Sequence, residues 1–430
     1  MRQLLLFFFA ITLAVSAHSQ QTLFCGFDVV MEKLEATHPG TLEACTAFYS
    51  ELPKYEQGGA RSAVYQVPVV FHVVWNTESQ NLSDEVIFDQ MAILNQDYRR
   101  LNPNAVDTRE VFLPVAADTE IEFYLADTDP DGNPTTGINR IQTDRESFEF
   151  DLFAQDITID EVKFTATGGA DAWDTDRYVN IWVCNITTSI PGAQIFGFAY
   201  PPNGAPNWDG LFPAPIADDV EGVVAHYTVI GSNNPAAGED NFPNNEGGRT
   251  LTHEVGHYLG LRHTWGDAFF NGCNADDGID DTPNISANNN FACNFNANTC
   301  NDGANDLPDM GENYMDYNQD DCLNLFTLGQ RSAMRFVLEN FREELIEGQF
   351  VSVQEATLPS ISLYPNPVSN TCVVNTGPGA HLVINASNGA QLFETSVTTS
   401  SVVLNFAEYQ PGVYFVRDLN SGAVQRVVKH

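Results

Sequence analysis

The sequence predicts a mixed α/β (α+β) domain built on a twisted mixed sheet, followed by a small all-β sandwich. Three observations lead to this prediction. A strongly β-branched run at residues 66–75 (QVPVVFHVVW) predicts a strand near the start of the first domain. A histidine-bearing segment with helical spacing follows the last apolar run of that domain. From residue 362 the chain alternates short apolar runs with Gly and Asn turns, which is typical of a sandwich.

The first domain is expected to place its strands before the histidine-bearing helix. Ser83 can cap a helix that runs to Tyr98. The histidine-bearing helix should begin near residues 248–251, and a capping box at Thr327 opens a long helix to about residue 347. Further strands are expected at residues 120–126, 178–184, 196–200 (an edge strand) and 222–230.

Composition divides the 430 residues into five segments. Arg2, the apolar run 4–15 and the small residues near Ala17 indicate a signal peptide. The Gly-rich stretch before Arg61 is an exposed link suited to proteolysis. The predicted segments are a signal peptide (1–20), a pro-segment (21–60), a main domain (61–348), a linker (349–361) and a sandwich domain (362–430).

The chain is strongly acidic, with 57 Asp and Glu against 19 Lys and Arg and a formal net charge of −38. This balance disfavours nucleic acid and anionic membrane surfaces as partners. No segment after the signal peptide is long and apolar enough to span a bilayer, so we expect no transmembrane helix in the mature chain. Plain solubility accounts for most of the acidic residues, although many carboxylates also favour calcium binding.

Eight cysteines fit an exported protein, because export permits disulfide bonds. Four of them bracket the loop-rich stretch after the histidine motif, which suggests two bridges. The spacing alone allows three pairings of these four. They are Cys273, Cys293, Cys300 and Cys322.

The histidine motif is the pattern H-E-x-x-H-x-x-G-x-x-H, and each fixed position has a chemical task. His253 and His257 lie four residues apart and so share one helix face. Gly260 can take positive φ at little cost, which ends the helix and returns His263 as a third ligand. Glu254 lies beside the same ion and can hold a water molecule. Three protein ligands with one open position describe a catalytic zinc site.

A chance match is the main alternative for this motif. A bare H-E-x-x-H occurs by accident in long helices, whereas five fixed positions at this spacing rarely do. Two other histidines, His72 and His226, lie in apolar runs where a satisfied core histidine is expected. A structural zinc in a non-catalytic surface adhesin is the rival function, and the presence of Glu254 argues against it.

The chain resembles the metzincin metalloproteases, and more specifically the pappalysin family. The residues that carry the resemblance span about 21–347. They are the zinc motif, His263-Thr264-Trp265, Asp281-Thr282-Pro283, Asn313-Tyr314-Met315-Asp316-Tyr317 and the segment 322–330. The resemblance implies a metzincin zinc-protease fold with an active-site helix, and a zinc-dependent endopeptidase that cleaves protein or peptide substrates.

Several residue roles are implied by the same resemblance. Met315 would form the Met-turn beneath the metal, and Tyr317 would stabilise the tetrahedral intermediate. Asp321 would be the acid of the primed-side pocket, which favours Arg or Lys there. The family's disulfide pattern implies the pairs Cys273–Cys300 and Cys293–Cys322. Side-chain preferences other than basic ones stay open.

The predicted pro-segment also resembles the family. Cys25-Gly26 matches a cysteine switch, in which a thiolate fills the open metal position of the latent enzyme, although Phe27 stands where the family usually has Thr. A Cys25–Cys45 disulfide is the competing interpretation. A cut before Arg61 would suit the enzyme's own preference, so self-activation is expected.

Calcium is the second expected ion. The acidic stretch near the cleft supplies hard oxygen ligands, and family members bind calcium in this region. A solvated acidic loop is the alternative. The candidate ligands are Asp277, Asp280, Asp281 and Thr282.

The last 69 residues resemble a type IX secretion sorting domain. The segment opens with Leu363-Tyr364-Pro365-Asn366-Pro367 and closes with residues 412–416 and 427–429. This resemblance implies outer-membrane secretion machinery as a partner, and a secreted or surface-attached protein that passes the periplasm of a Gram-negative bacterium. An accessory adhesion sandwich is the alternative.

Overall fold

The structure is a computed structural model that divides into two compact units, Met1–Gln349 and Phe350–His430. The signal peptide, the linker, Cys45 and the link before Arg61 lie outside the described residues. The described residues are 25–37, 64–154, 156–190, 192–202, 218–239, 245–266, 272–287, 292–303, 306–346, 362–376, 379–386, 390–420 and 424–430.

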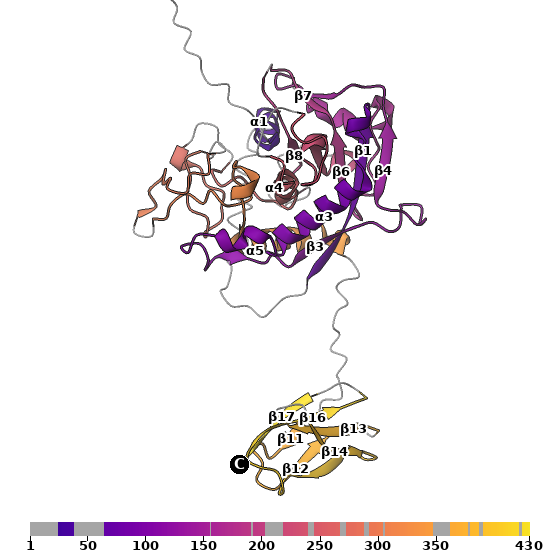
Figure 1. Ribbon diagram of the computed structural model, residues 1–430, viewed down its shortest axis with the longest axis vertical. Helices are drawn as coiled ribbons and strands as arrows, with labels where there is room; N and C mark the ends of the chain where they lie inside the picture. The colour runs from indigo at the N-terminus through magenta and orange to yellow at the C-terminus, as the bar shows by residue number, and fades with distance from the viewer. Residues whose placement is uncertain are drawn as a thin grey trace, which may run out of the picture. The chain divides into compact units, whose positions relative to one another are not determined.

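The first unit is built on a mixed sheet with the strand order β3-β1-β6-β9-β8, in which β4 also pairs with β1 (Figure 1). All pairs are parallel except β8 with β9. β8 lies at the edge of the sheet, as the sequence predicts, and the structure shows that it runs antiparallel to its neighbour. The strands are β1 (Tyr65–Trp75), β3 (Ile121–Leu125), β4 (Ile138–Gln142), β6 (Val179–Cys184), β8 (Gly197–Ala199) and β9 (Val223–His226). Two small sheets pair β2 (Ala116–Ala117) with β10 (Phe326–Thr327) and β5 (Phe148–Phe150) with β7 (Ile186–Thr188).

Successive side chains of each strand point to opposite faces of the sheet, and both faces are apolar. In β6, Ile181 packs in one core while Trp182 packs in the other. The first core also contains apolar residues of three helices, α3 (Asp84–Tyr98), α4 (Arg249–Tyr258) and α5 (Leu328–Asn340). The fourth helix, α1 (Phe27–Thr37), contributes to both cores and is drawn beside β8 and α4 in Figure 1. The predicted α/β class is therefore confirmed.

Two elements end earlier than their sequence patterns predict. The strand expected at 222–230 stops at His226, because the ring of His226 accepts the backbone N–H of Thr228 and starts a 3-10 turn. The helix expected to reach residue 347 ends at Asn340. Beyond it, the guanidinium of Arg342 is bound by the carbonyl of Tyr258 and the carboxylate of Glu221, which favours a turn over further helix.

The second unit is a β-sandwich, as predicted. A three-stranded sheet, β11-β12-β15, and a four-stranded sheet, β14-β13-β16-β17, share one apolar core. The strands are β11 (Ser362–Tyr364), β12 (Thr371–Asn375), β13 (His381–Ala386), β14 (Gln391–Ser396), β15 (Ser401–Asn405), β16 (Gly412–Asp418) and β17 (Val424–Lys429). Among the described residues of both units, no helix combines the length and apolarity needed to cross a membrane.

Candidate metal centre and adjoining pocket

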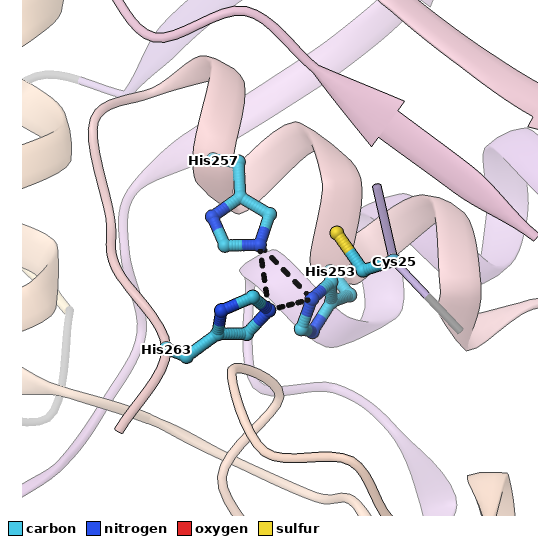
Figure 2. A group of neighbouring side chains, drawn as sticks. All are labelled: Cys25, His253, His257 and His263. Atoms are coloured by element: carbon cyan, nitrogen blue, oxygen red, sulfur yellow. Dashed lines mark hydrogen bonds between the residues drawn. The ribbon is translucent and has the colours of Figure 1, made fainter. Parts of the chain in front are cut away.

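Three imidazoles converge at the end of α4 (Figure 2). His253 and His257 lie one turn apart on the helix, which ends in a Schellman motif. In this motif Gly260, at φ 89°, donates to the carbonyl of His257, and Leu261 donates to the carbonyl of Gly256. The turn brings back His263, and the three Nε2 atoms lie 3.0 to 3.1 Å from one another.

The outward nitrogen of each ring faces an acceptor. Nδ1 of His253 lies 2.7 Å from the carbonyl oxygen of Tyr314, and Nδ1 of His257 lies 2.8 Å from that of Leu261. Nδ1 of His263 lies 2.7 Å from Oδ1 of Asp28. These contacts place the proton on Nδ1 and turn the Nε2 lone pairs toward a common centre.

The donor set fits zinc. Ligands about 2.0–2.1 Å from one tetrahedral ion are separated by roughly 3.3 Å, close to the observed spacing of the Nε2 atoms. Burial lowers the pKa of His253 to about 3, so its ring is neutral, as a ligand must be. Among the described residues, the three histidines with Cys25 are the one group of three or more His, Cys, Asp or Glu side chains close enough to share an ion.

Glu254 is fully buried beside the histidines, and burial raises its pKa to about 8. Its Oε2 accepts a hydrogen bond from the Cys25 thiol at 3.3 Å, while Oε1 has no hydrogen-bond partner within the described part of the chain. The edge strand β8 passes close to this carboxylate. A Cβ atom at Gly197 would lie 2.7 Å from Cγ of Glu254, so the approach requires glycine here.

The start of the predicted pro-segment fills the space in front of the metal centre. Cys25 contributes its Sγ to the metal-ligand group and has a free thiol, whereas Cys45 lies outside the described residues. Burial raises the pKa of this thiol, so a cation between the imidazoles is the charge that would hold it as a thiolate. Gly26 donates to the carbonyl of Gly197 at 2.7 Å, which fixes the segment along β8.

Two further pro-segment residues contact the ligands themselves. Phe27 stacks on the ring of His257 with centroids 3.9 Å apart, and the carboxylate of Asp28 faces His263. Phe27 occupies the position where Thr is usual in the family, and its ring packs face to face on the imidazole of His257. The contact of Asp28 with His263 could not be predicted from the sequence, because nothing in the spacing of Asp28 from Cys25 indicates it.

The turn at 313–317 lies beneath α4. Met315 is fully buried, and a Cβ atom at Gly256 would lie 2.5 Å from its Sδ, so the turn packs directly on the helix backbone. The turn is held by a 2.9 Å bond from the Met315 N–H to Oδ1 of Asn313. Tyr317 is buried beside His253, and its hydroxyl donates to the carbonyl of Cys25 at 3.4 Å.

A pocket opens beside Glu254 and His253, and its wall includes the carboxylates of Asp316 and Asp320 but not that of Asp321. Asp320 lines the pocket together with Arg249, whereas Asp321 is exposed and is absent from the pocket wall. The two carboxylates separate because residues 320–322 form a 3-10 turn that buries Asp320 against α4. Oδ2 of Asp320 accepts the backbone N–H groups of Gly247 at 2.7 Å and Arg249 at 3.3 Å. Burial raises its pKa to about 6.

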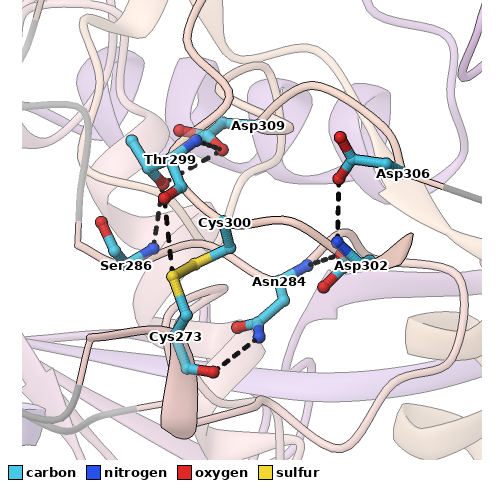
Figure 3. Close-up of a disulfide and its surroundings, with 8 residues drawn as sticks. All are labelled: Cys273, Asn284, Ser286, Thr299, Cys300, Asp302, Asp306 and Asp309. Atoms are coloured by element: carbon cyan, nitrogen blue, oxygen red, sulfur yellow. Dashed lines mark hydrogen bonds between the residues drawn. A yellow bond between two sulfur atoms is a disulfide. The ribbon is translucent and has the colours of Figure 1, made fainter.

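Two disulfides, Cys273–Cys300 and Cys293–Cys322, cross-link the loop-rich stretch, and they are the pairs that the family resemblance implied. Figure 3 shows the first of them. Around the first bridge, Asn284 donates to the carbonyl of Cys273, and the Sγ of Cys273 lies 3.5 Å from the carbonyl of Thr299.

The calcium candidates do not gather their side chains around one point. Both carboxylate oxygens of Asp277 accept the hydroxyl of Thr282, whereas Asp280, Asp281 and Thr282 line a separate cavity. The buried Oδ1 of Asp281 has no hydrogen-bond partner within the described ranges. Calcium therefore stays a prediction.

Comparison with known proteins adds two family matches and several solved relatives. The family described as pregnancy-associated plasma protein-A matches residues 225–339, and a secretion system C-terminal sorting domain matches residues 362–430. Mature mirolysin of Tannerella forsythia, solved in complex with a cleaved peptide, is 38% identical with a TM-score of 0.56. The match covers 67% of this chain and 97% of that one. A promirolysin mutant from the same organism is 35% identical with a TM-score of 0.61, over 75% and 97% of the two chains.

Curated relatives agree with these matches. An extracellular metalloprotease of Arthroderma benhamiae is 40% identical over 119 residues, or 26% of this chain. The chain spans 37% of the length of that relative. An extracellular metalloprotease of Pyricularia oryzae is 28% identical over 287 residues, covering 66% of this chain and 78% of the relative.

Proposed function

Since the chain belongs to the pappalysin family of metzincin metallopeptidases, we propose that it is a secreted zinc metalloendopeptidase made as a latent precursor. The observation that carries this proposal is the convergence of three buried imidazoles beside a buried carboxylate. A structural zinc site needs no such carboxylate. Because one oxygen of Glu254 has no partner among the described residues and is available to a water molecule, the geometry favours hydrolysis over the adhesin alternative.

The residues divide the reaction among themselves. Zinc held by His253, His257 and His263 would polarise the scissile carbonyl and make water acidic enough to attack it. Glu254 orients that water, takes its proton and later passes the proton to the leaving amine. The hydroxyl of Tyr317 donates to the developing oxyanion once the carbonyl of Cys25 has left.

The pocket supports a preference for Arg or Lys immediately after the scissile bond. Asp320 presents a buried carboxylate in the wall of the pocket that His253 and Glu254 also line. A buried carboxylate binds a guanidinium through charge-assisted, bidentate hydrogen bonds. The cleaved peptide bound by mirolysin supports peptides as the class of ligand for this cleft.

Latency is proposed to depend on the residues that follow Cys25. The thiolate of Cys25 would occupy the open ligand position. The Cys25 side chain also lies 3.3 Å from Oε2 of Glu254 and so blocks access to the general base. Phe27 and Asp28 add contacts to two of the metal ligands. Cleavage before Arg61, outside the described residues, would release this segment and fits the proposed preference for basic residues.

The sorting-domain match supports export through an outer-membrane secretion system. We infer passage through the periplasm, followed by release or surface attachment of the mature enzyme. Calcium binding near residues 277–282 is retained as part of the proposal, because Asp280, Asp281 and Thr282 line one cavity with the hard oxygen atoms that suit this ion.

The test is cleavage-site mapping of a peptide library by mature protein, with and without a chelator. We expect cuts that precede Arg or Lys and stop when zinc is removed, with activity restored by added zinc. Chelator-resistant cleavage would refute the metal mechanism. Cuts without a basic residue on the primed side would refute the proposed role of Asp320 while leaving the protease assignment intact.

A further inference from the structure

A buried carboxylate outside the pocket, Asp97, is connected both to the metal centre and to the pocket. It lies on α3 and is 2% exposed. Its Oδ1 accepts the hydroxyl of Tyr314 at 2.7 Å, and its Oδ2 accepts the hydroxyl of Thr252 at 2.9 Å. Tyr314 in turn supplies the carbonyl that faces His253. Asp97 thus fixes the two residues that flank the first metal ligand in space.

Arg249 is the positive group that faces Asp97. Its Nε lies 3.5 Å from Oδ1 of Asp97, and one terminal nitrogen donates to Oδ1 of Asn104 at 2.8 Å. The other terminal nitrogen donates to the backbone carbonyl of Asp320. The guanidinium of Arg249 therefore binds the backbone carbonyl of Asp320, and among the described contacts it makes no hydrogen bond to the Asp320 carboxylate.

Within the described part of the chain, the hydrogen bonds to the Asp320 carboxylate come from backbone amides, and the charge of Arg249 acts on it only through space. The N–H groups of Gly247 and Arg249 bind Oδ2 at the start of α4, where the helix dipole also favours a negative charge. A Cβ atom at Gly247 would lie 2.8 Å from Cβ of Asp320, so this approach requires glycine. Amides fix the carboxylate without neutralising it, and its charge stays available to a ligand.

We propose that Asp97 is a positioning residue for substrate selection, which holds the charge of Arg249 away from the Asp320 carboxylate and so preserves the basic preference of the pocket. This inference rests on the proposed function. Arg249 lines the same pocket, and an unpaired guanidinium there would repel a basic side chain and compete for Asp320. Asp97 prevents both effects because it provides the nearer, fully buried countercharge.

Asp97→Asn is the decisive variant, because the amide keeps the shape of the side chain and can still bond Tyr314 and Thr252. Arg249 would then lose its countercharge and turn to Asp320. We expect the ratio of kcat/KM for a peptide with Arg after the scissile bond to that for its Leu analogue to fall about tenfold or more, mainly through KM for the Arg peptide. Zinc content should stay at the level of the unchanged protein.

The double variant Asp97→Asn with Arg249→Gln separates this effect from a general loss of structure. Removing the released cation should restore the Arg-to-Leu ratio, even if both peptides are cleaved more slowly. Arg249→Gln alone should keep or raise the ratio, and this variant tests the idea even if Asp97→Asn fails to fold. An equal loss for both peptides in Asp97→Asn, no recovery in the double variant, or a fall of the ratio in Arg249→Gln would each overturn the proposal. If the unchanged protein shows no preference for the Arg peptide over the Leu peptide, the proposed function of the pocket is refuted, and this result is distinct from a refutation of the role of Asp97.

Discussion

The three ligand histidines come from one continuous segment, residues 253–263, whereas the pocket beside them is assembled from three segments far apart in the chain. The pocket needs Asp97 from α3, the start of α4, and the turn that contains Asp320. Helical spacing and one glycine bring the histidines together, and acceptors from Tyr314 and Asp28 complete the orientation of two of the rings. The charge of the pocket depends instead on which buried carboxylate is paired with Arg249. In this protein the metal ligands therefore come mainly from one short segment, whereas the proposed selectivity depends on contacts between segments that are distant in the sequence.

Glu254→Ala should produce the largest effect, because it removes the general base and leaves the three ligands in place. We expect kcat to fall by a factor of about 10² to 10⁴ while zinc content is retained. Initial rates on a fluorogenic Arg peptide and elemental analysis measure the two quantities. Near-normal cleavage by this variant would defeat the proposed mechanism.

Cys25→Ser tests whether the thiol keeps the precursor silent. In a precursor that also carries Arg61→Ala, so that the predicted cut is blocked, the serine variant should hydrolyse peptide at least about tenfold faster than the cysteine parent, since a weaker ligand occupies the metal position. A precursor that stays equally silent would indicate that the remaining contacts are enough for latency.

Asp320→Asn addresses the pocket directly. Loss of a charge-assisted hydrogen bond costs about 1.5–3 kcal/mol, so cleavage before Arg should weaken roughly ten- to hundredfold relative to cleavage before Leu. Asp321→Asn is the matched control, because its carboxylate is the exposed neighbour and the ratio should not change. If Asp321→Asn lowers the Arg-to-Leu ratio and Asp320→Asn does not, Asp321 is the residue that binds the basic side chain, as expected from the sequence.

Asp28→Asn should weaken latency less than Cys25→Ser, because it alters a contact with one ligand and leaves the thiol in place. The expected loss is about tenfold in the affinity of a synthetic peptide of residues 22–37 for the mature Glu254→Ala protein, measured by calorimetry. Equal binding of both peptides would show that the contact with His263 contributes nothing to inhibition.

The pH dependence of selectivity should be the smallest effect. The pKa of Asp320 is raised to about 6 by burial, with the guanidinium and backbone amide of Arg249 and the Gly247 amide opposing the rise, and Asp97 adding to it. The carboxylate is charged above that value and protonated below it. The Arg-to-Leu ratio should therefore fall severalfold between pH 7 and pH 5. The same ratio in Asp320→Asn should be flat over this range.

Much of the architecture could be predicted because its signals are short-range. The β-branched run of β1, the Ser83 cap of α3 and the Thr327 capping box each act within a few residues, and each element begins within a residue or two of the expected position. The early ends of β9 and α5 could not be predicted. They depend on a histidine ring that caps its own chain and on Arg342 reaching α4, contacts that compete with local propensity.

The sequence alone was enough to predict that the three histidines converge beside Glu254, because spacing along one helix carries that information. The family resemblance in turn supplied the position of Met315 under α4 and the bounds of the sorting-domain match. Folding was needed to bury Asp320 and leave Asp321 exposed, to bring Asp28 to His263, and to pair Arg249 with Asp97. The physical reason is that burial and charge pairing depend on which distant segments meet. Two adjacent aspartates cannot be distinguished in the sequence, and they differ only when folding buries one and leaves the other exposed to solvent.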